Sequence, residues 1–243
     1  ATYYANVENL DRAVGRILDH LEKQGLAENT LVVFASDNGP ETLNRYRGSE
    51  RSYGTTGGLR GMKLHLYEGG TRVPTLLRWP GRTAAGRVSD ELIWNLDFFP
   101  TLAAAAGVSI QNLPKALDGQ DLTPLLTGRA FRRKTPFFWY YHNALGRPKL
   151  VVQEGDWKLL GLADLPHILN RDLPKRAADL RRVNPTEYEL FNVRTDPAEQ
   201  RNVADEHPAL VRRLQARMRR LHRETLAESP TWVGTNDPNE PTR

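Results

Sequence analysis

The 243-residue sequence contains no cysteine. Its own residues therefore cannot form a disulfide, a thiolate metal site or a cysteine nucleophile, and the redox compartment stays open. No apolar run approaches the roughly 18 residues that a membrane-spanning helix needs. The first residues, Ala1-Thr2-Tyr3-Tyr4, also lack the basic start and the apolar core of a signal peptide. We therefore expect no membrane span, and a piece of a longer protein would lack such a signal whatever its destination.

Apolar residues make up 39% of the chain and charged residues 26%, as in an ordinary globular protein. The formal net charge is +5. Most of the excess lies in one arginine-rich helical stretch, which is typical of a solvated helix face. Its members are Arg212, Arg213, Arg217, Arg219, Arg220 and Arg223. No nucleic-acid recognition motif accompanies them, so we expect no nucleic acid partner and at most a mild attraction for polyanionic substrates.

The first part of the chain predicts an α/β fold. Apolar residues recur at three- and four-residue steps from Tyr3 to Leu21, which predicts an amphipathic helix ending near Gly25. Residues 31–35 then form a run that is apolar on both faces, as in a buried strand of a parallel sheet. We therefore expect part of a large mixed, mostly parallel sheet flanked by helices.

Downstream, residues 40–72 show no periodicity and predict a long loop. A strand is expected at 74–79 and a helix at 97–106. A small α+β subdomain with an antiparallel sheet and a closing helix is then expected from about residue 130. Its elements are strands at 135–141, 150–153, 157–160 and 187–193, a helical insertion at 164–182 and a helix at 208–224.

Asp37 and Asn38 directly follow the apolar strand at 31–35. Ligands of α/β sheets gather at the carboxyl ends of strands, and carboxylate and amide oxygens suit calcium or magnesium. Two ligands cannot complete a shell of six to eight. A plain Asp-Asn-Gly turn is the alternative, and the dipeptide alone favours it.

Lys63 lies in a glycine-rich loop between Gly61 and Gly69. A lysine near a cation suits a tetrahedral oxyanion, whereas an exposed loop lysine is the alternative. His65 and His142 are weaker candidates for substrate contact. For both, the residue type favours a structural role.

Ten short motifs, in order, carry a resemblance to a family over residues 1 to about 225. They lie at 3–11, 37–39, 59–63, 68–74, 79–81, 97–102, 117–122, 155–159, 188–192 and 196–199. Examples are Asp-Asn-Gly, Glu-Gly-Gly-x-Arg-x-Pro and Gly-Asp-Trp-Lys-Leu. The ordered set resembles the type I sulfatases of the alkaline phosphatase superfamily.

This resemblance implies that Asp37 and Asn38 correspond to two calcium ligands and Lys63 to the lysine that contacts the sulfate. It also implies a formylglycine, made from the first residue of Cys/Ser-x-Pro-Ser-Arg, whose hydrate attacks sulfur. The present sequence contains no such motif. The nucleophile is therefore expected in a missing N-terminal part of the same protein, which would also complete the fold.

By this resemblance the chain is the C-terminal portion of an enzyme acting on a sulfated small molecule or sulfated carbohydrate, in a periplasmic, secreted or lysosomal-type compartment. The expected organisation is the C-terminal half of a catalytic domain (1–130), an antiparallel-sheet subdomain (131–228) and an extended or disordered tail (229–243). A phosphate or phosphonate monoester hydrolase of the same superfamily is one alternative. A non-catalytic calcium-binding or interaction fragment is another, and the isolated chain is expected to be inactive.

Overall fold

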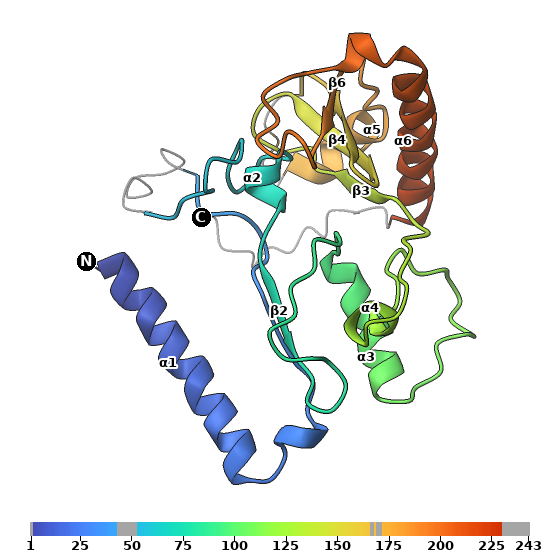
Figure 1. Cartoon of the computed structure of the whole chain (residues 1–243). Coiled ribbons are helices and arrows are strands. Elements are labelled where there is room, and N and C mark those ends of the chain that lie inside the picture. Colours follow the sequence, from blue (N-terminus) through green and yellow to red (C-terminus); the bar gives the residue numbers. More distant parts are fainter. Residues whose placement is uncertain (1, 43–52, 166–167, 169–171, 230–243) are drawn as a thin grey trace, which may run out of the picture. The chain divides into compact units, whose positions relative to one another are not determined.

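A computed structural model describes residues 2–42, 53–165, 168 and 172–229. The chain divides into two compact units (Figure 1). Unit 1 comprises residues 1–57 and 69–136, and unit 2 comprises residues 58–68 and 137–243. The short segment 58–68 therefore packs with strands from much later in the sequence. The expected tail lies outside the described residues from position 230 onward.

Unit 1 begins with the helix α1 (Thr2–Lys23), followed by a 3-10 turn, η1 (Ala27–Asn29). Gly25 ends the helix with a positive φ of 66°, a conformation that only glycine adopts without cost. The strand β1 (Val32–Ala35) follows and pairs antiparallel with β2 (Thr75–Arg78). The predicted helix and both predicted strands are therefore confirmed.

The expected large, mostly parallel sheet is not seen among the residues that the structure describes, where β1 and β2 form a two-stranded antiparallel ribbon. The apolar run at 31–35 indicates burial on two faces, but apolarity does not specify the direction of a neighbouring strand. On this ribbon Phe34 and Leu76 remain exposed.

Short helices complete unit 1. The predicted helix at 97–106 is confirmed as η3 (Asn95–Asp97) followed by α3 (Phe98–Ala105). Two single-turn helices were not predicted: α2 (Glu68–Thr71), which begins at the junction with unit 2, and α4 (Thr123–Leu126). Helices this short have too little periodicity to be read from a sequence.

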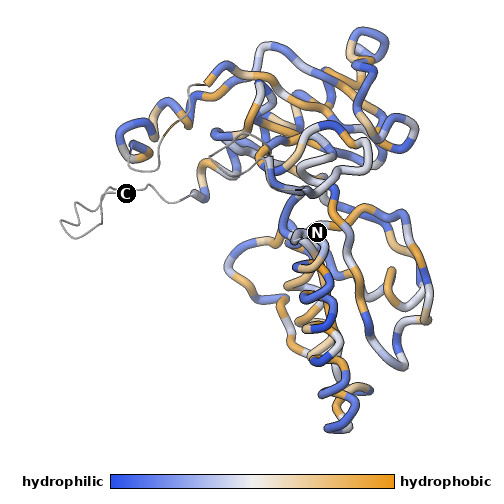
Figure 2. Tube along the Cα trace, turned by 90° about the vertical axis from the view of Figure 1, so that its left-hand side faces the viewer, coloured by the Kyte–Doolittle hydropathy of each residue, from blue (hydrophilic) through white to orange (hydrophobic). Residues whose placement is uncertain are grey.

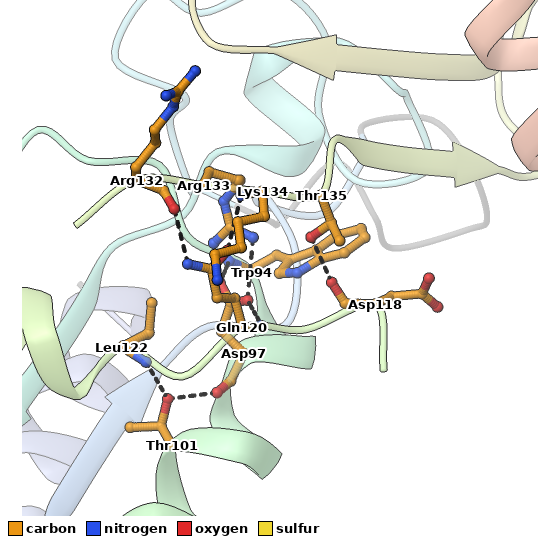
Figure 3. Close-up of polar contacts among 10 residues, drawn as sticks. All are labelled: Trp94, Asp97, Thr101, Asp118, Gln120, Leu122, Arg132, Arg133, Lys134 and Thr135. Carbon is orange, nitrogen blue, oxygen red and sulfur yellow. Dashed lines mark hydrogen bonds and ion pairs between the residues drawn. The ribbon is translucent and has the colours of Figure 1, made fainter. Parts of the chain in front are cut away.

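A buried polar network around Asp97 joins three segments of unit 1 (Figure 3). The fully buried Asp97 carboxylate accepts hydrogen bonds from the backbone of Trp94 at 3.0 Å and of Gln120 at 2.7 Å. The Arg133 guanidinium binds both carboxylate oxygens. Thr101 donates to the Asp97 carbonyl oxygen at 2.6 Å. Buried charge is tolerated here because every oxygen of the carboxylate is satisfied.

Gly119 allows the closest approach in this network. A Cβ on Gly119 would lie 1.9 Å from the Leu96 carbonyl oxygen, which no side chain can tolerate. The glycine of the Leu-Asp-Gly-Gln-Asp-Leu motif is thus required by packing.

Unit 2 is built on a four-stranded antiparallel sheet in the order β3-β4-β5-β6. The strands are β3 (Phe137–Tyr140), β4 (Pro148–Glu154), β5 (Trp157–Leu162) and β6 (Glu187–Asn192). Two helices accompany them, α5 (Leu173–Arg181) within the predicted insertion and α6 (Pro208–Glu228), with a 3-10 turn η5 (Ala204–Glu206) before α6. The predicted strands, their antiparallel sheet and the closing helix are confirmed.

Both faces of this sheet are covered. On one face Leu214 and Met218 of α6 pack on apolar residues of the strands. On the other, Leu66 and Tyr67 pack on Val151, Leu160 and Phe191. Segment 58–68 is therefore a layer of the unit 2 core. Part of the arginine excess on α6 is paired, since Arg213 and Arg217 bind Glu154 and Arg220 binds Glu224. No helix in the described part of the chain is long and apolar enough to cross a bilayer.

Candidate functional site

Asp37 and Asn38 lie in the turn that follows β1. Asp37 is exposed and makes no side-chain hydrogen bond with a described residue. The Oδ1 atom of Asn38 is buried, and among the described residues it has no hydrogen-bond donor. A buried acceptor without a donor costs about 1–3 kcal/mol. Because an amide oxygen is also a ligand for hard cations, this atom fits a calcium site.

The backbone of Gly39 fixes this turn against α2. The Gly39 N–H donates to the Gly70 carbonyl oxygen at 3.0 Å. A Cβ on Gly39 would lie only 1.9 Å from the Gly69 carbonyl oxygen. The Asp-Asn-Gly and Glu-Gly-Gly motifs thus meet through glycine backbones, which places Asn38 beside α2. The Ser36 hydroxyl also braces the turn by donating to the Asn38 carbonyl oxygen at 2.9 Å.

These two residues cannot form a complete cation site. Within the described ranges no cluster of three or more histidine or acidic side chains could hold a metal ion. Calcium takes six to eight oxygen ligands. The donor types fit calcium, and the remaining ligands would have to come from outside this pair.

Lys63 lies half-buried in a turn of segment 58–68. The next residue, Leu64, has a φ of 72°, and its carbonyl oxygen accepts the Leu145 N–H at 2.8 Å. The Nδ1 atom of His65 lies 3.2 Å from the Met62 carbonyl oxygen and 3.4 Å from the Met62 nitrogen. These local contacts of His65 are typical of a histidine that braces a turn.

His142 follows β3, and its ring meets the Tyr141 ring edge-on at a centroid distance of 6.0 Å. The predicted site residues are thus divided between the units. Asp37 and Asn38 belong to unit 1, whereas Lys63, His65 and His142 belong to unit 2.

Sequence reasoning missed a buried charged cluster in unit 2, whose members are Glu68, Lys158 and Glu199. Lys158 is fully buried, and its Nζ atom lies 2.8 Å from the Glu68 carboxylate and 3.1 Å from the Glu199 carboxylate. Glu199 also accepts the Glu68 N–H. Burial raises the pKa of Glu199, and the Lys158 ammonium partly offsets the rise. The sequence does contain a signal for this cluster. Lys158, Leu160 and Leu162 are two residues apart and therefore lie on the same face of β5, and a lysine on a buried face needs a buried partner of opposite charge.

The chain matches known sulfatases. The family described as Sulfatase matches residues 1–108, and the family described as N-sulphoglucosamine sulphohydrolase, C-terminal, matches residues 62–169. The chain is 47% identical to arylsulfatase A of Homo sapiens over 151 residues, which is 61% of this chain and 28% of that protein. It is 32% identical to an N-acetylgalactosamine-6-O-sulfatase of Bacteroides thetaiotaomicron over 211 residues, covering 84% and 39% respectively.

A solved structure is also similar. It comes from work on the metabolism of multiple glycosaminoglycans by Bacteroides thetaiotaomicron, with a TM-score of 0.66 and 28% identity, covering 88% of this chain and 43% of that one. The chain thus spans roughly a quarter to two fifths of its relatives' length. The ordered motifs, the fold and these matches agree, and the chain belongs to the sulfatase family of the alkaline phosphatase superfamily, as a C-terminal portion.

Proposed function

We propose that this chain is part of an enzyme that hydrolyses sulfate esters, and that Asp37 and Asn38 bind calcium there. The observation that carries this proposal is the buried Oδ1 atom of Asn38, which accepts no hydrogen bond from a described residue. A buried acceptor without a hydrogen bond is unfavourable unless a cation or a donor reaches it. Membership of the sulfatase family supports calcium as that cation.

Calcium bound there would offset negative charge that develops on sulfuryl oxygens. The contribution of this chain is to fix two oxygen donors. The turn at Asn38 is held by glycine backbone contacts and by the Ser36 hydroxyl, so its amide is positioned before any ligand binds. Asp37 is exposed and adds the negative charge that a divalent cation requires.

Lys63 is proposed to hold a sulfuryl oxygen as charge builds in the transition state. An ammonium group is a compact point charge that suits a tetrahedral oxyanion. Its half-buried position would strengthen the interaction, because charges attract more strongly when water is partly excluded. His65 and His142 are secondary candidates for contact with the rest of the substrate, which we propose to be a sulfated carbohydrate or a sulfated small molecule.

The sequence has no cysteine and no Ser-x-Pro-Ser-Arg motif, so the formylglycine nucleophile would come from sequence outside these 243 residues. We propose that an N-terminal part of the same protein supplies it, extends the β1–β2 ribbon into a larger, mostly parallel sheet, and covers apolar side chains such as Ile17 and Leu76. On this proposal residues 1–130 complete the catalytic domain, residues 131–228 form the C-terminal subdomain, and the protein works in a periplasmic, secreted or lysosomal-type compartment.

The test uses the full-length protein and an aryl sulfate substrate. Asp37→Ala and Asn38→Ala should each lower bound calcium, measured by metal analysis of the dialysed protein, together with sulfatase activity. Asp90→Ala removes another exposed aspartate of unit 1 and should change neither quantity. If Asp37→Ala keeps the parent's calcium content and turnover, the assignment is wrong.

A further inference from the structure

Two residues of the described chain, apart from glycines, have a positive φ. They are Leu64, at 72°, and Glu199, at 52°. A left-handed conformation is unfavourable for a residue such as leucine, because its Cβ approaches the following carbonyl oxygen. It persists only where surrounding contacts determine it, and such residues cluster at functional sites. Leu64 directly follows Lys63 in segment 58–68. Glu199 belongs to the buried charged cluster and contacts Arg60 and Glu68 of the same segment.

Four sets of polar contacts fasten segment 58–68 to strands and loops of unit 2. Near its start, the Arg60 guanidinium lies 3.8 Å from the centroid of the Tyr67 ring and donates to the Glu199 carbonyl oxygen at 3.2 Å. At its middle, Leu64 accepts the Leu145 N–H. Near its end, the Tyr67 hydroxyl donates to Glu189 of β6 at 2.7 Å.

The fourth set of contacts is the buried cluster of Glu68, Lys158 and Glu199, called here the carboxylate–lysine trio. Glu68 is 3% exposed, and Lys158 and Glu199 are fully buried. Lys158 contacts both carboxylates, and Glu199 accepts the backbone N–H of Glu68. Removing Lys158 would leave two buried carboxylates without a counter-charge, and removing Glu199 would leave the buried Glu68 N–H without its acceptor; both changes are unfavourable. The trio therefore specifies where the segment ends, with little tolerance for displacement.

We propose that the trio is a positioning device: it clamps segment 58–68 onto the C-terminal sheet and thereby sets the position of Lys63. The inference rests on the proposed role of Lys63 toward the sulfate group. An ammonium that stabilises charge in a transition state must be held within about 0.5 Å of its productive position. Lys63 lies in a turn without regular secondary structure, so its position depends on these anchors rather than on a helix or a strand.

The test compares Glu199→Ala with Glu199→Gln in the full-length protein. Alanine removes the acceptor of the Glu68 N–H and one of the two charges facing Lys158. Glutamine keeps the size and an acceptor oxygen, and it leaves Lys158 paired with Glu68. For Glu199→Ala we expect backbone amides of residues 59–68 to exchange with solvent at least about tenfold faster. We also expect kcat for 4-nitrophenyl sulfate to fall at least about tenfold while KM stays within about threefold, because the lost contact acts in the transition state. Glu199→Gln should restore most of both quantities.

A matched control separates positioning from general weakening of the sheet. Glu154→Ala breaks ion pairs with Arg213 and Arg217 on the other face of the same sheet and touches no residue of segment 58–68. It should leave the exchange of residues 59–68 and kcat unchanged. The proposal is overturned if Glu199→Ala leaves either the exchange or kcat at the parent's value, or if the Glu154→Ala control reproduces its effects.

Lys63→Ala, measured in parallel, distinguishes failure of the proposed role of Lys63 from failure of the positioning role of the trio. A fall in its kcat of about 100- to 1000-fold supports the proposed function and gives the ceiling for any positioning effect. If Lys63→Ala stays within threefold of the parent, the proposed role of Lys63 fails and positioning for catalysis fails with it. The exchange measurement on Glu199→Ala then still decides whether the trio holds the segment.

Discussion

The two units bury their apolar side chains very differently. Every large apolar side chain that is exposed in the described residues belongs to unit 1. Figure 2 shows hydrophobic positions recurring along the tube of α1 between hydrophilic ones. The exposed residues are Tyr4, Val7, Leu10, Ile17, Leu26, Phe34, Tyr53, Leu76, Val88, Leu96, Phe99, Leu102, Val108, Leu113 and Leu117.

Unit 2 instead holds most of the buried apolar side chains, including Leu150, Leu159 and Leu190 on one face of its sheet and Val151 and Leu160 on the other. Buried apolar residues of unit 1 are few, and its buried residues include the charged network of Asp97. Burial of apolar surface is the main favourable term in folding. Unit 2 thus contains the means of its own stability, whereas unit 1 leaves many apolar side chains exposed, which supports the proposal that a further part of the protein covers them.

Amide hydrogen exchange on the 243-residue chain gives the most direct test of this contrast. Amides of β4 and β5 should exchange roughly 10⁴-fold more slowly than those of α1. The strands open only when unit 2 unfolds globally, whereas α1 buries none of its residues. Equal protection of α1 and β4 would show that unit 1 is stable without a partner.

Breaking the buried network around Asp97 should destabilise unit 1 selectively. Arg133→Met leaves the buried Asp97 carboxylate without its counter-charge, which typically costs about 3–5 kcal/mol. Amide hydrogen exchange should accelerate in α3, because the Thr101 hydroxyl of this helix donates to the Asp97 carbonyl oxygen. It should not change in β4 or β5. Arg129→Met, at an exposed arginine of the same unit, is the control. Loss of protection in both units would contradict their independence.

Matched truncations of apolar residues should have unequal effects in the two units. Leu160→Ala removes a fully buried side chain of unit 2 and should cost about 2–5 kcal/mol of unfolding free energy. Ile17→Ala removes a side chain that is 60% exposed and should cost less than about 0.5 kcal/mol in this chain. Chemical denaturation measures both. In the full-length protein the cost of Ile17→Ala should rise, since the proposed N-terminal part would bury it. An unchanged cost of Ile17→Ala in the full-length protein would count against the proposal that an N-terminal part buries Ile17.

The smallest expected effect concerns pH. Burial lowers the pKa of His222 on α6, whose ring lies 4.6 Å from the Tyr140 ring. The unfolded chain then binds a proton more readily than the folded one. Stability from neutral His222 is therefore fully present above a pH of about 6.5 and is lost as the pH falls through the lower folded pKa.

His222→Phe should accordingly flatten the fall in melting temperature of unit 2 between pH 7 and pH 5. His20→Phe, at an exposed histidine of α1, should leave the pH profile unchanged. A profile that is equally steep in the parent and in His222→Phe would show that other groups cause the pH dependence.

Periodic apolar positions placed α1, α3 and α6, and apolar or aromatic runs bounded by turn residues placed the six strands, each to within a few residues. The ordered motifs likewise determined the family. The sequence also identified Asp37, Asn38 and Lys63 as candidates, although their roles remain proposals. It could not predict α2 or α4, because a single turn carries no periodic pattern.

Only the tertiary structure decided which residues meet. It paired β1 antiparallel with β2, and it joined Gly39 to Gly69 and Gly70 through backbone contacts that no side-chain pattern encodes. It also gathered Glu68, Lys158 and Glu199 from three distant motifs into one buried trio. Local sequence specifies the conformation of a segment. The partner of a buried charge is settled only when desolvation forces distant segments to satisfy one another.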